Sequence, residues 1–169
     1  DERTKELKKA NNELTEKNTI VHQQKELLEI RSKEIKDSIE YAKRIQNASF
    51  PTRKILEKIS SDYFIFYKPK EIVSGDFYWI HKYENYVMFA VADCTGHGVP
   101  GAFMSVIGIN LLNEIVIEKG EKRPDKILFD LRKKLINALN QNEENNLQND
   151  GMDIALCKWN LIDNTLEFS

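Results

Sequence analysis

The chain has 169 residues, a formal net charge of −2 and only two cysteines. Its length allows one globular domain with an additional element. A near-neutral charge with no basic block argues against a nucleic-acid-binding surface, and two cysteines cannot build a disulfide framework, which suits a reducing cytoplasm. The chain begins with Asp and shows no leader peptide, so we interpret it as an internal fragment of a cytoplasmic protein. The longest apolar run, residues 86–92, is far shorter than the roughly 20 residues of a membrane span, so we expect no membrane contact.

Residues 1–49 lack Gly and Pro, and their apolar side chains recur at a seven-residue spacing. The repeat consists of Leu7, Leu14, Val21, Leu28 and Ile35. If these are the d positions of a heptad, the a positions are Thr4, Asn11, Asn18, Lys25, Ser32 and Ile39. Leu at d with Asn at a is typical of a parallel two-stranded coiled coil, so we predict a homodimer through residues 1–49, weakened by its polar a layer. The alternative is a solvated single helix supported by i, i+4 charge pairs.

From Ile35 onwards the apolar stripe broadens, which predicts that the end of this helix lies against a globular domain. We therefore expect residues 1–49 to form a coiled coil and regulatory linker, and residues 50–169 to form the domain. The linker helix could pack against the domain in two ways and so regulate it. Pro51 should end the long helix. One more short helical segment is predicted by Ile55, Leu56 and Ile59.

The domain shows the patterns of an α+β fold. Aromatic and β-branched residues predict strands at 61–69, 76–82 and 86–93, with a tight turn at 83–85. A helix is predicted over about 100–118, ended by Gly120, with one face formed by Phe103, Val106, Ile107, Leu111 and Ile115. A second helix is predicted from Pro124, with inward residues Ile127, Leu128, Leu131, Leu135 and Leu139. After a polar loop at 141–151, a hairpin of 152–160 and 165–169 completes a sheet covered by a helical layer.

Two acids sit beside glycines: Asp76 in VSGDFYW and Asp93 in ADCTGHG. If the strands on either side of the 83–85 turn pair, both carboxylates lie at the open end of a hairpin. Two such carboxylates repel each other unless a cation lies between them, and oxygen ligation suits Mg²⁺ or Mn²⁺. A metal pair could then convert water to hydroxide and hold a phosphoryl oxygen. Close approach to the metals would be allowed by the turn glycines Gly75, Gly96 and Gly98.

Other interpretations of these residues exist. Each Asp could simply cap a turn, and the glycines could simply allow positive φ. Cys94 and His97 have the spacing of half a zinc site but lack further nearby ligands, so we interpret His97 as a turn residue with a local hydrogen bond. The segment GHGVPG lacks the Lys-Ser/Thr of a P-loop and the third glycine of a Rossmann turn. Cys94 as a nucleophile is a weaker possibility.

The segments FYKPKEIVSGDFYWI and VMFAVADCTGHGVPGAFMSVIG resemble the SpoIIE/RsbU branch of the protein phosphatase 2C-like, metal-dependent Ser/Thr phosphatases. The resemblance extends to IQNASFP before the domain and to DGMDIALC after it. It implies an α-β-β-α sandwich with a two-metal site at one end of the sheet. By resemblance, Asp93 bridges both metals, the backbone carbonyl of Cys94 ligates one of them, and Asp76 lies in the metal shell.

The resemblance also implies a function. The usual substrates are phosphoserine or phosphothreonine on anti-sigma-factor antagonist proteins, and a preceding helix regulates the phosphatase. Family domains have a later metal-binding Asp, which we expect beyond Ser169, so the two-metal site could be incomplete here. We interpret Asp153 as a strand-start residue rather than its replacement, and Glu144, Asp150 and Asp163 as loop or turn acids. The competing hypothesis is a non-catalytic dimerisation or interaction module.

Overall fold

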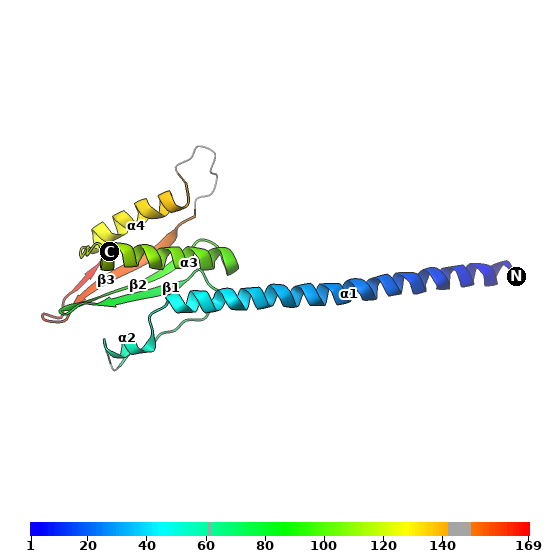
Figure 1. Ribbon diagram of the computed structural model, residues 1–169, viewed down its shortest axis with the longest axis horizontal. Coiled ribbons are helices and arrows are strands. Elements are labelled where there is room, and N and C mark those ends of the chain that lie inside the picture. The colour runs from blue at the N-terminus through cyan, green and yellow to red at the C-terminus, as the bar shows by residue number, and fades with distance from the viewer. Residues whose placement is uncertain (61, 142–149) are drawn as a thin grey trace. The chain divides into compact units, whose positions relative to one another are not determined.

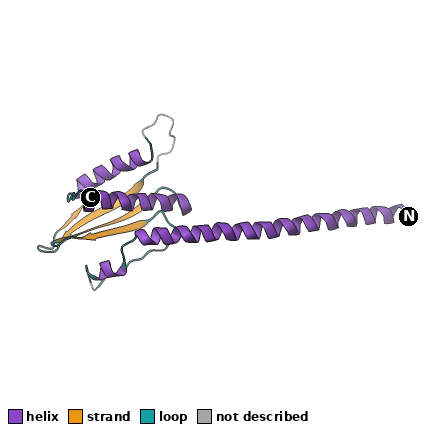
Figure 2. Ribbon diagram, in the orientation of Figure 1, coloured by secondary structure: helices purple, strands orange, loops and turns teal. Residues whose placement is uncertain are grey.

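The computed structural model describes residues 1–60, 62–141 and 150–169. Two predictions fall partly outside this range: Ser61 of the strand predicted at 61–69, and residues 142–149 of the polar loop, which include Glu144. The chain divides into two compact units, Asp1–Ile39 and Glu40–Ser169. Figures 1 and 2 show the elements, and each unit is described by itself below.

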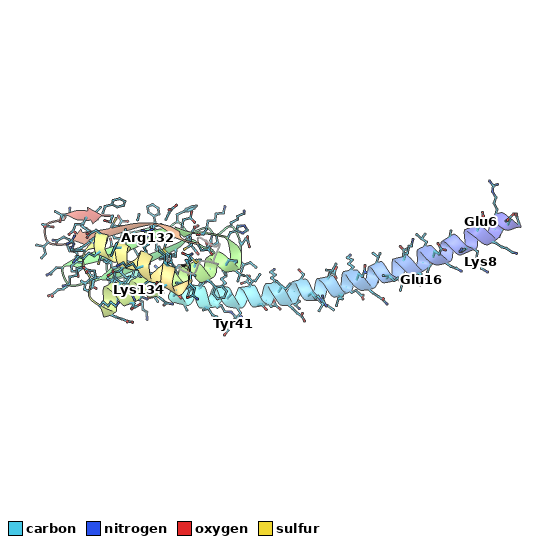
Figure 3. The ribbon with its side chains drawn as sticks, turned by 90° about the horizontal axis from the view of Figure 1, so that it is seen from above. Glu6, Lys8, Glu16, Tyr41, Arg132 and Lys134 are labelled. Atoms are coloured by element: carbon cyan, nitrogen blue, oxygen red, sulfur yellow. The ribbon has the colours of Figure 1, made fainter. Side chains whose placement is uncertain are left out.

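The first unit is a stretch of the helix α1 (Glu2–Ser49), which confirms the predicted long helix and its end before Pro51. Its side chains stand out all around the helix axis, as Figure 3 shows at Glu6, Lys8 and Glu16. The residues of the seven-residue repeat are exposed in the single chain, with Leu7 73% and Leu28 67% accessible. The helix carries i, i+4 ion pairs such as Lys25–Glu29 at 3.9 Å, which contribute little at an exposed position. The coiled-coil dimer stays a prediction.

The second unit is built on an antiparallel four-stranded sheet in the order β1-β2-β3-β4. The strands are β1 (Phe77–Lys82), β2 (Tyr86–Cys94), β3 (Met152–Asn160) and β4 (Leu166–Phe168). Both predicted hairpins are therefore confirmed, because β1 pairs with β2 and β3 with β4. The pairing of β2 with β3 joins the two hairpins into one sheet.

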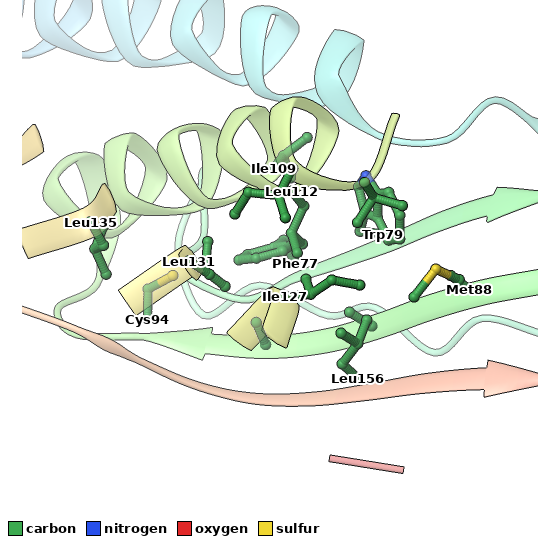
Figure 4. Close-up of a cluster of buried hydrophobic side chains, with 14 of the residues drawn as sticks. Phe77, Trp79, Met88, Cys94, Ile109, Leu112, Ile127, Leu131, Leu135 and Leu156 are labelled. Carbon is green, nitrogen blue, oxygen red and sulfur yellow. The ribbon is translucent and has the colours of Figure 1, made fainter. Parts of the chain in front are cut away.

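One face of this sheet is covered by helices. α3 (Gly98–Leu112) continues into the π-helical segment η1 (Asn113–Glu118), and α4 (Pro124–Ala138) follows. The short α2 (Arg53–Glu57) lies before the sheet in the sequence, as predicted. Side chains of α3, η1 and α4 meet those of the sheet in one core (Figure 4), which includes Phe77, Met88, Ile109, Leu112, Ile127 and Leu156. One helical layer on one sheet is a partial form of the predicted α+β sandwich.

The predicted face of the first domain helix was wrong in part. Phe103 is 67% exposed, whereas the helix buries Ala102, Met104, Ser105, Gly108, Ile109 and Leu112. The sequence of α3 is apolar on nearly every side, so its pattern did not fix which side faces the sheet. The choice comes from close packing: a Cβ at Gly108 would lie 3.0 Å from the ring of Phe77. The inward face predicted for α4 is confirmed, with Ile127, Leu131 and Leu135 buried.

The stretch Gly98–Glu118 is long and apolar enough to cross a membrane by length and composition alone. Half of it is buried inside the domain, where it packs on the sheet as the core helix. Residues 86–92 are the longest uninterrupted apolar run of the chain. The helix contains a few polar residues that interrupt such a run but leave its average hydropathy high. Its burial is that of a core helix in a globular domain.

The strand predicted at 61–69 was wrong over its described residues. Residues 63–69 have no regular structure, and the side chains of Phe64 and Phe66 are 90% and 84% exposed. The aromatic and β-branched residues are present, but none of the strands within residues 1–60, 62–141 and 150–169 pairs with this segment. A strand needs the hydrogen bonds of a neighbour to form, so propensity alone did not make this segment a strand.

Candidate functional site

Three acidic residues stand opposite one another on neighbouring strands at one end of the sheet. In the pairing of β1 with β2, Phe77 stands opposite Ala92. Asp76, just before Phe77, therefore stands opposite Asp93, just after Ala92. The register of the next pair places Asp93 opposite Asp153, the second residue of β3, in agreement with its predicted place at the start of a strand. Successive residues of a strand point to opposite faces, and the neighbours Ala92 and Phe77 are buried against the helices. All three carboxylates therefore lie on the face away from α3 and α4.

Asp76 and Asp93 are in contact. The pKa of the Asp76 carboxyl is raised, first because partial burial disfavours its charged form, and then because of a hydrogen bond with Asp93 and the negative charge of Asp93. The hydroxyl of Ser74 opposes this shift by donating to the carboxylate. The structure thus brings together the two acids that the sequence singled out. Such a pair favours a shared proton or a cation between its oxygens.

Cys94 offers its backbone and not its thiol. The side chain is 4% exposed in the core, and burial raises the pKa of the thiol to about 12, with smaller contributions from the charges of Asp93 and Asp76. A thiol with this pKa carries almost no thiolate at neutral pH, which argues against the nucleophile hypothesis. The carbonyl oxygen of Cys94 instead faces the loop before β1, 3.1 Å from where a Cβ of Gly75 would stand.

The zinc hypothesis gains no support from the side-chain positions. The His97 ring is exposed and its Nδ1 lies 2.5 Å from Oε1 of Glu71, while the Cys94 thiol is buried. Within residues 1–60, 62–141 and 150–169, no group of three or more His, Cys, Asp or Glu side chains could hold a metal ion by itself. The three carboxylates thus form part of a metal shell at most.

The glycines around the acids serve two different purposes. Gly96 and Gly98 have φ values of +85° and +62°, so the turn after β2 needs residues that adopt the left-handed region. Gly75 and Gly101 are instead packed against backbone. A Cβ at Gly75 would lie 2.9 Å from the carbonyl oxygen of Gly96, and a Cβ at Gly101 would lie 2.7 Å from the same oxygen and 3.0 Å from the backbone of Gly75.

A buried glutamine near the end of α1, Gln46, contacts the loop that carries Asp76. Gln46 is 2% exposed, and its Nε2 donates to the carbonyl oxygen of Ser74 at 2.5 Å and to Oγ of Ser105 at 2.7 Å. The backbone N–H of Ser74 donates back to Oε1 of Gln46 at 3.3 Å. Just after α1, the ring of Phe50 stacks on Tyr78 of β1, with centroids 5.1 Å apart. Sequence reasoning missed Gln46, because a lone Gln in a polar helix carries no sign of burial.

Two further links hold the turn after Asp93. Thr95 binds the residue before β3: its N–H and hydroxyl lie 2.9 and 2.8 Å from the carbonyl oxygen of Gly151. On the other side, His97 pairs with Glu71, as described above. The sequence predicted a local hydrogen bond for His97, whereas its partner lies 26 residues earlier. Glu71 was missed because exposed acids are common and give no signal of their own.

A groove of about 1060 Å³ runs along the uncovered face of the sheet. Its walls are residues 63–68 and the end of α2 on one side and the outward side chains of β1, β2 and β3 on the other. The lining is mostly apolar, and the three acids Asp76, Asp93 and Asp153 belong to it. Lys68 also lines the groove and is exposed, so a cation lies along the same wall.

The paired acids lie at one end of the sheet, which is where the resemblance to PP2C-like phosphatases implies a metal site. Among solved structures, the "SiaA-PP2C domain of Pseudomonas aeruginosa" is similar, with 30% sequence identity and a TM-score of 0.72. The match covers 81% of this chain and 53% of that chain, so this chain spans about half the length of the structure it matches.

The sequence profile described as Stage II sporulation protein E (SpoIIE) matches residues 83–169, and the chain belongs to this family. The predicted resemblance and the partial PP2C-like fold are thereby confirmed. The matched residues include Asp93 and the glycine turn but begin after Asp76. A search of curated proteins gives no match.

We predict that Gly101→Ala damages the site through its backbone. The atoms nearest to the added Cβ would be backbone atoms of Gly96 and Gly75, which cannot move aside as a flexible side chain could. Overpacking of this kind costs about 1–3 kcal/mol of unfolding free energy. Urea unfolding of the variant should show this loss. The control is Gly151→Ala, where a Cβ meets no atom within 4 Å, and an equal loss in both variants would contradict the explanation.

We also predict a pH-dependent effect of Asp76→Asn on the metal-free chain. Because its pKa is raised, the Asp76 carboxyl binds its proton more tightly in the folded state than in the unfolded chain. Its contribution therefore lowers the free energy of unfolding as pH rises from the ordinary pKa of 3.8 through the raised value. The variant should therefore melt above the wild type at pH 7, with the difference vanishing below about pH 3. A difference that is constant with pH would contradict the assigned cause.

Proposed function

We propose that this chain is part of a metal-dependent phosphatase that removes phosphate from phosphoserine or phosphothreonine of a regulatory protein. The observation that carries the proposal is the contact between Asp76 and Asp93 at the end of the uncovered sheet face, with the raised pKa of Asp76. Membership of the SpoIIE family supports the phosphatase class. The Ser/Thr specificity is part of the proposal.

The residues present fit Mn²⁺ or Mg²⁺. Two carboxylates in contact repel when both are charged, and a divalent cation between them would relieve this repulsion. Oxygen donors from Asp76, Asp93 and the carbonyl of Cys94 are the kind that these ions prefer. When bound, the ions would supply an activated water and neutralise charge on the phosphoryl group. Completing a two-metal site requires donors beyond these three, since the described residues offer no fuller cluster.

The roles of the chain's own residues follow from their positions. Asp93, near the end of β2, would help to hold the ions because it stands between Asp76 and Asp153 in neighbouring strands. Asp76 would help to hold one ion, whose positive charge would offset the burial and the neighbouring charge of Asp93 that raise the pKa of its carboxyl. The glycine turn would leave room for the phosphorylated side chain to approach, because its residues carry no Cβ.

Regulation through α1 is the second part of the proposal. Within the unit Glu40–Ser169, Gln46 joins the last turns of α1 to Ser74, two residues before Asp76. A shift of these turns would therefore move the loop that carries Asp76. We infer that a homodimeric coiled coil through residues 1–49 regulates the site through this end of the helix. The seven-residue repeat of exposed apolar side chains supports the dimer.

The partners proposed are a phosphoprotein, of the kind formed by anti-sigma-factor antagonists, and a second copy of the chain. The near-neutral net charge gives no support for a nucleic-acid partner, and we propose a cytoplasmic location. The alternative function is a non-catalytic dimerisation or interaction module. It is favoured by one observation, namely that the described residues contain no group of three or more metal-binding side chains.

The first prediction concerns metal binding. Calorimetric titration of the chain with Mn²⁺ should give a binding signal that Asp93→Asn abolishes. The substitution replaces the charged carboxylate between Asp76 and Asp153 with an uncharged amide, which is a weaker ligand for the ion. The matched control is Asp37→Asn, which makes the same charge change on the exposed surface of α1. Equal binding by both variants would contradict the assignment of Asp93, and absence of binding by the wild type would favour the non-catalytic alternative.

The second prediction concerns the dimer. Introducing Leu14→Lys and Leu28→Lys places charges at two d positions, which should convert the dimer to a monomer in analytical ultracentrifugation. Activity toward a phosphorylated peptide, measured with a longer chain that contains a complete domain, should change as well. The control is Lys17→Glu with Lys33→Glu, since both residues lie off the a and d positions. Loss of the dimer with unchanged activity would sink the regulatory part of the proposal.

A further inference from the structure

The turn after Asp93 is connected to both segments that carry the other two acids. Thr95 binds Gly151, two residues before Asp153. His97 binds Glu71, five residues before Asp76. The backbone of Gly75 lies against the carbonyl oxygens of Cys94 and Gly96. Of these contacts, the one between His97 and Glu71 alone joins two side chains, so it can be removed without touching the backbone.

The position of the Glu71 carboxylate is set by a second contact. Its Oε2 lies 2.6 Å from where a Cβ of Gly98 would stand, so the carboxylate rests on the backbone of the first residue of α3. The amino end of a helix carries partial positive charge, which favours a carboxylate at this place. His97, the residue that caps α3, makes no side-chain hydrogen bond to the helix itself. Glu71 therefore contacts both the capping residue and the helix start.

We infer that the Glu71–His97 pair is a positioning device that holds the loop of Asp76 against the turn of Asp93. The inference rests on the proposed function, since it assigns the pair a task in shaping the metal-binding acids. Neither side chain reaches the acids in the described contacts, so neither is a catalytic residue. The pair acts by fixing the separation of the two loops before any ion arrives. Such preorganisation lowers the cost of bringing two like charges together.

The geometry gives this contact more weight than an ordinary exposed ion pair. The side chains are 73% and 45% exposed, and pairs at such positions contribute little to global stability. A short bond to a carboxylate is stronger than a neutral one, and here it closes a loop whose other end is held by Gln46 through Ser74. The expected consequence is local order around the acids with little change in melting temperature.

The test is a double-mutant cycle of Glu71→Ala and His97→Ala, read first without metal. Hydrogen exchange of the amides in residues 72–76 and 95–98 should quicken about threefold to tenfold in each single variant. The double variant should exchange no faster than the single ones, because both substitutions remove the same contact. Glu71→Gln, which keeps an acceptor oxygen, should recover part of the protection. The control is Asp125→Ala, which removes the exposed Arg123–Asp125 pair at the start of α4.

A second readout links the pair to metal binding. The dissociation constant for Mn²⁺ should rise about threefold to tenfold in each single variant, again without a further rise in the double variant. Exchange rates equal to the wild type, or effects that add in the double variant, would overturn the inference. If the wild type binds no Mn²⁺, the proposed function has failed, while the exchange experiment still decides whether the pair positions the loops.

Discussion

The site depends on the packing of backbone against backbone around two glycines. Gly75, before β1, and Gly101, in the first turn of α3, both lie against the carbonyl oxygen of Gly96, at distances that leave no room for a Cβ. This contact brings the loop of Asp76, the turn of Asp93 and the start of α3 into one small volume. Hydrogen bonds and ion pairs elsewhere in the site only refine a geometry that the missing side chains make possible.

Within that volume the carboxylates of Asp76 and Asp93 lie close enough to repel each other when both are charged. Asp76 and Asp93 share a hydrogen bond, and burial together with the neighbouring charge raises the pKa of Asp76. Carboxyl groups with shifted pKa values at the end of a groove are typical of functional sites. The surrounding contacts of Gln46, Thr95 and Glu71 each hold one of the segments that bear the acids. These contacts make the site a junction between α1, the sheet and α3.

The uncovered face of the sheet explains both the groove and the failed strand. The segment 63–69 has the aromatic and β-branched residues of a strand but pairs with none of the described strands. Its residues 63–68 line the groove, with Phe64 and Phe66 exposed. A sheet that buries one face and leaves apolar side chains on the other is half of a two-layer arrangement. The similarity to about half of a longer solved chain agrees with this description.

Local pattern in the sequence determined the long helix, both hairpins, the inward face of α4 and the pairing of Asp76 with Asp93, because spacing and turn residues act over short distances. It also identified the family, through motifs that are contiguous. Tertiary structure alone decided which side of α3 is buried, that residues 63–69 remain unpaired, and that Gln46 and Glu71 contact the segments of the site. Those outcomes depend on neighbours between 26 and 59 residues away in the chain, and a side chain's own identity does not say what lies opposite it.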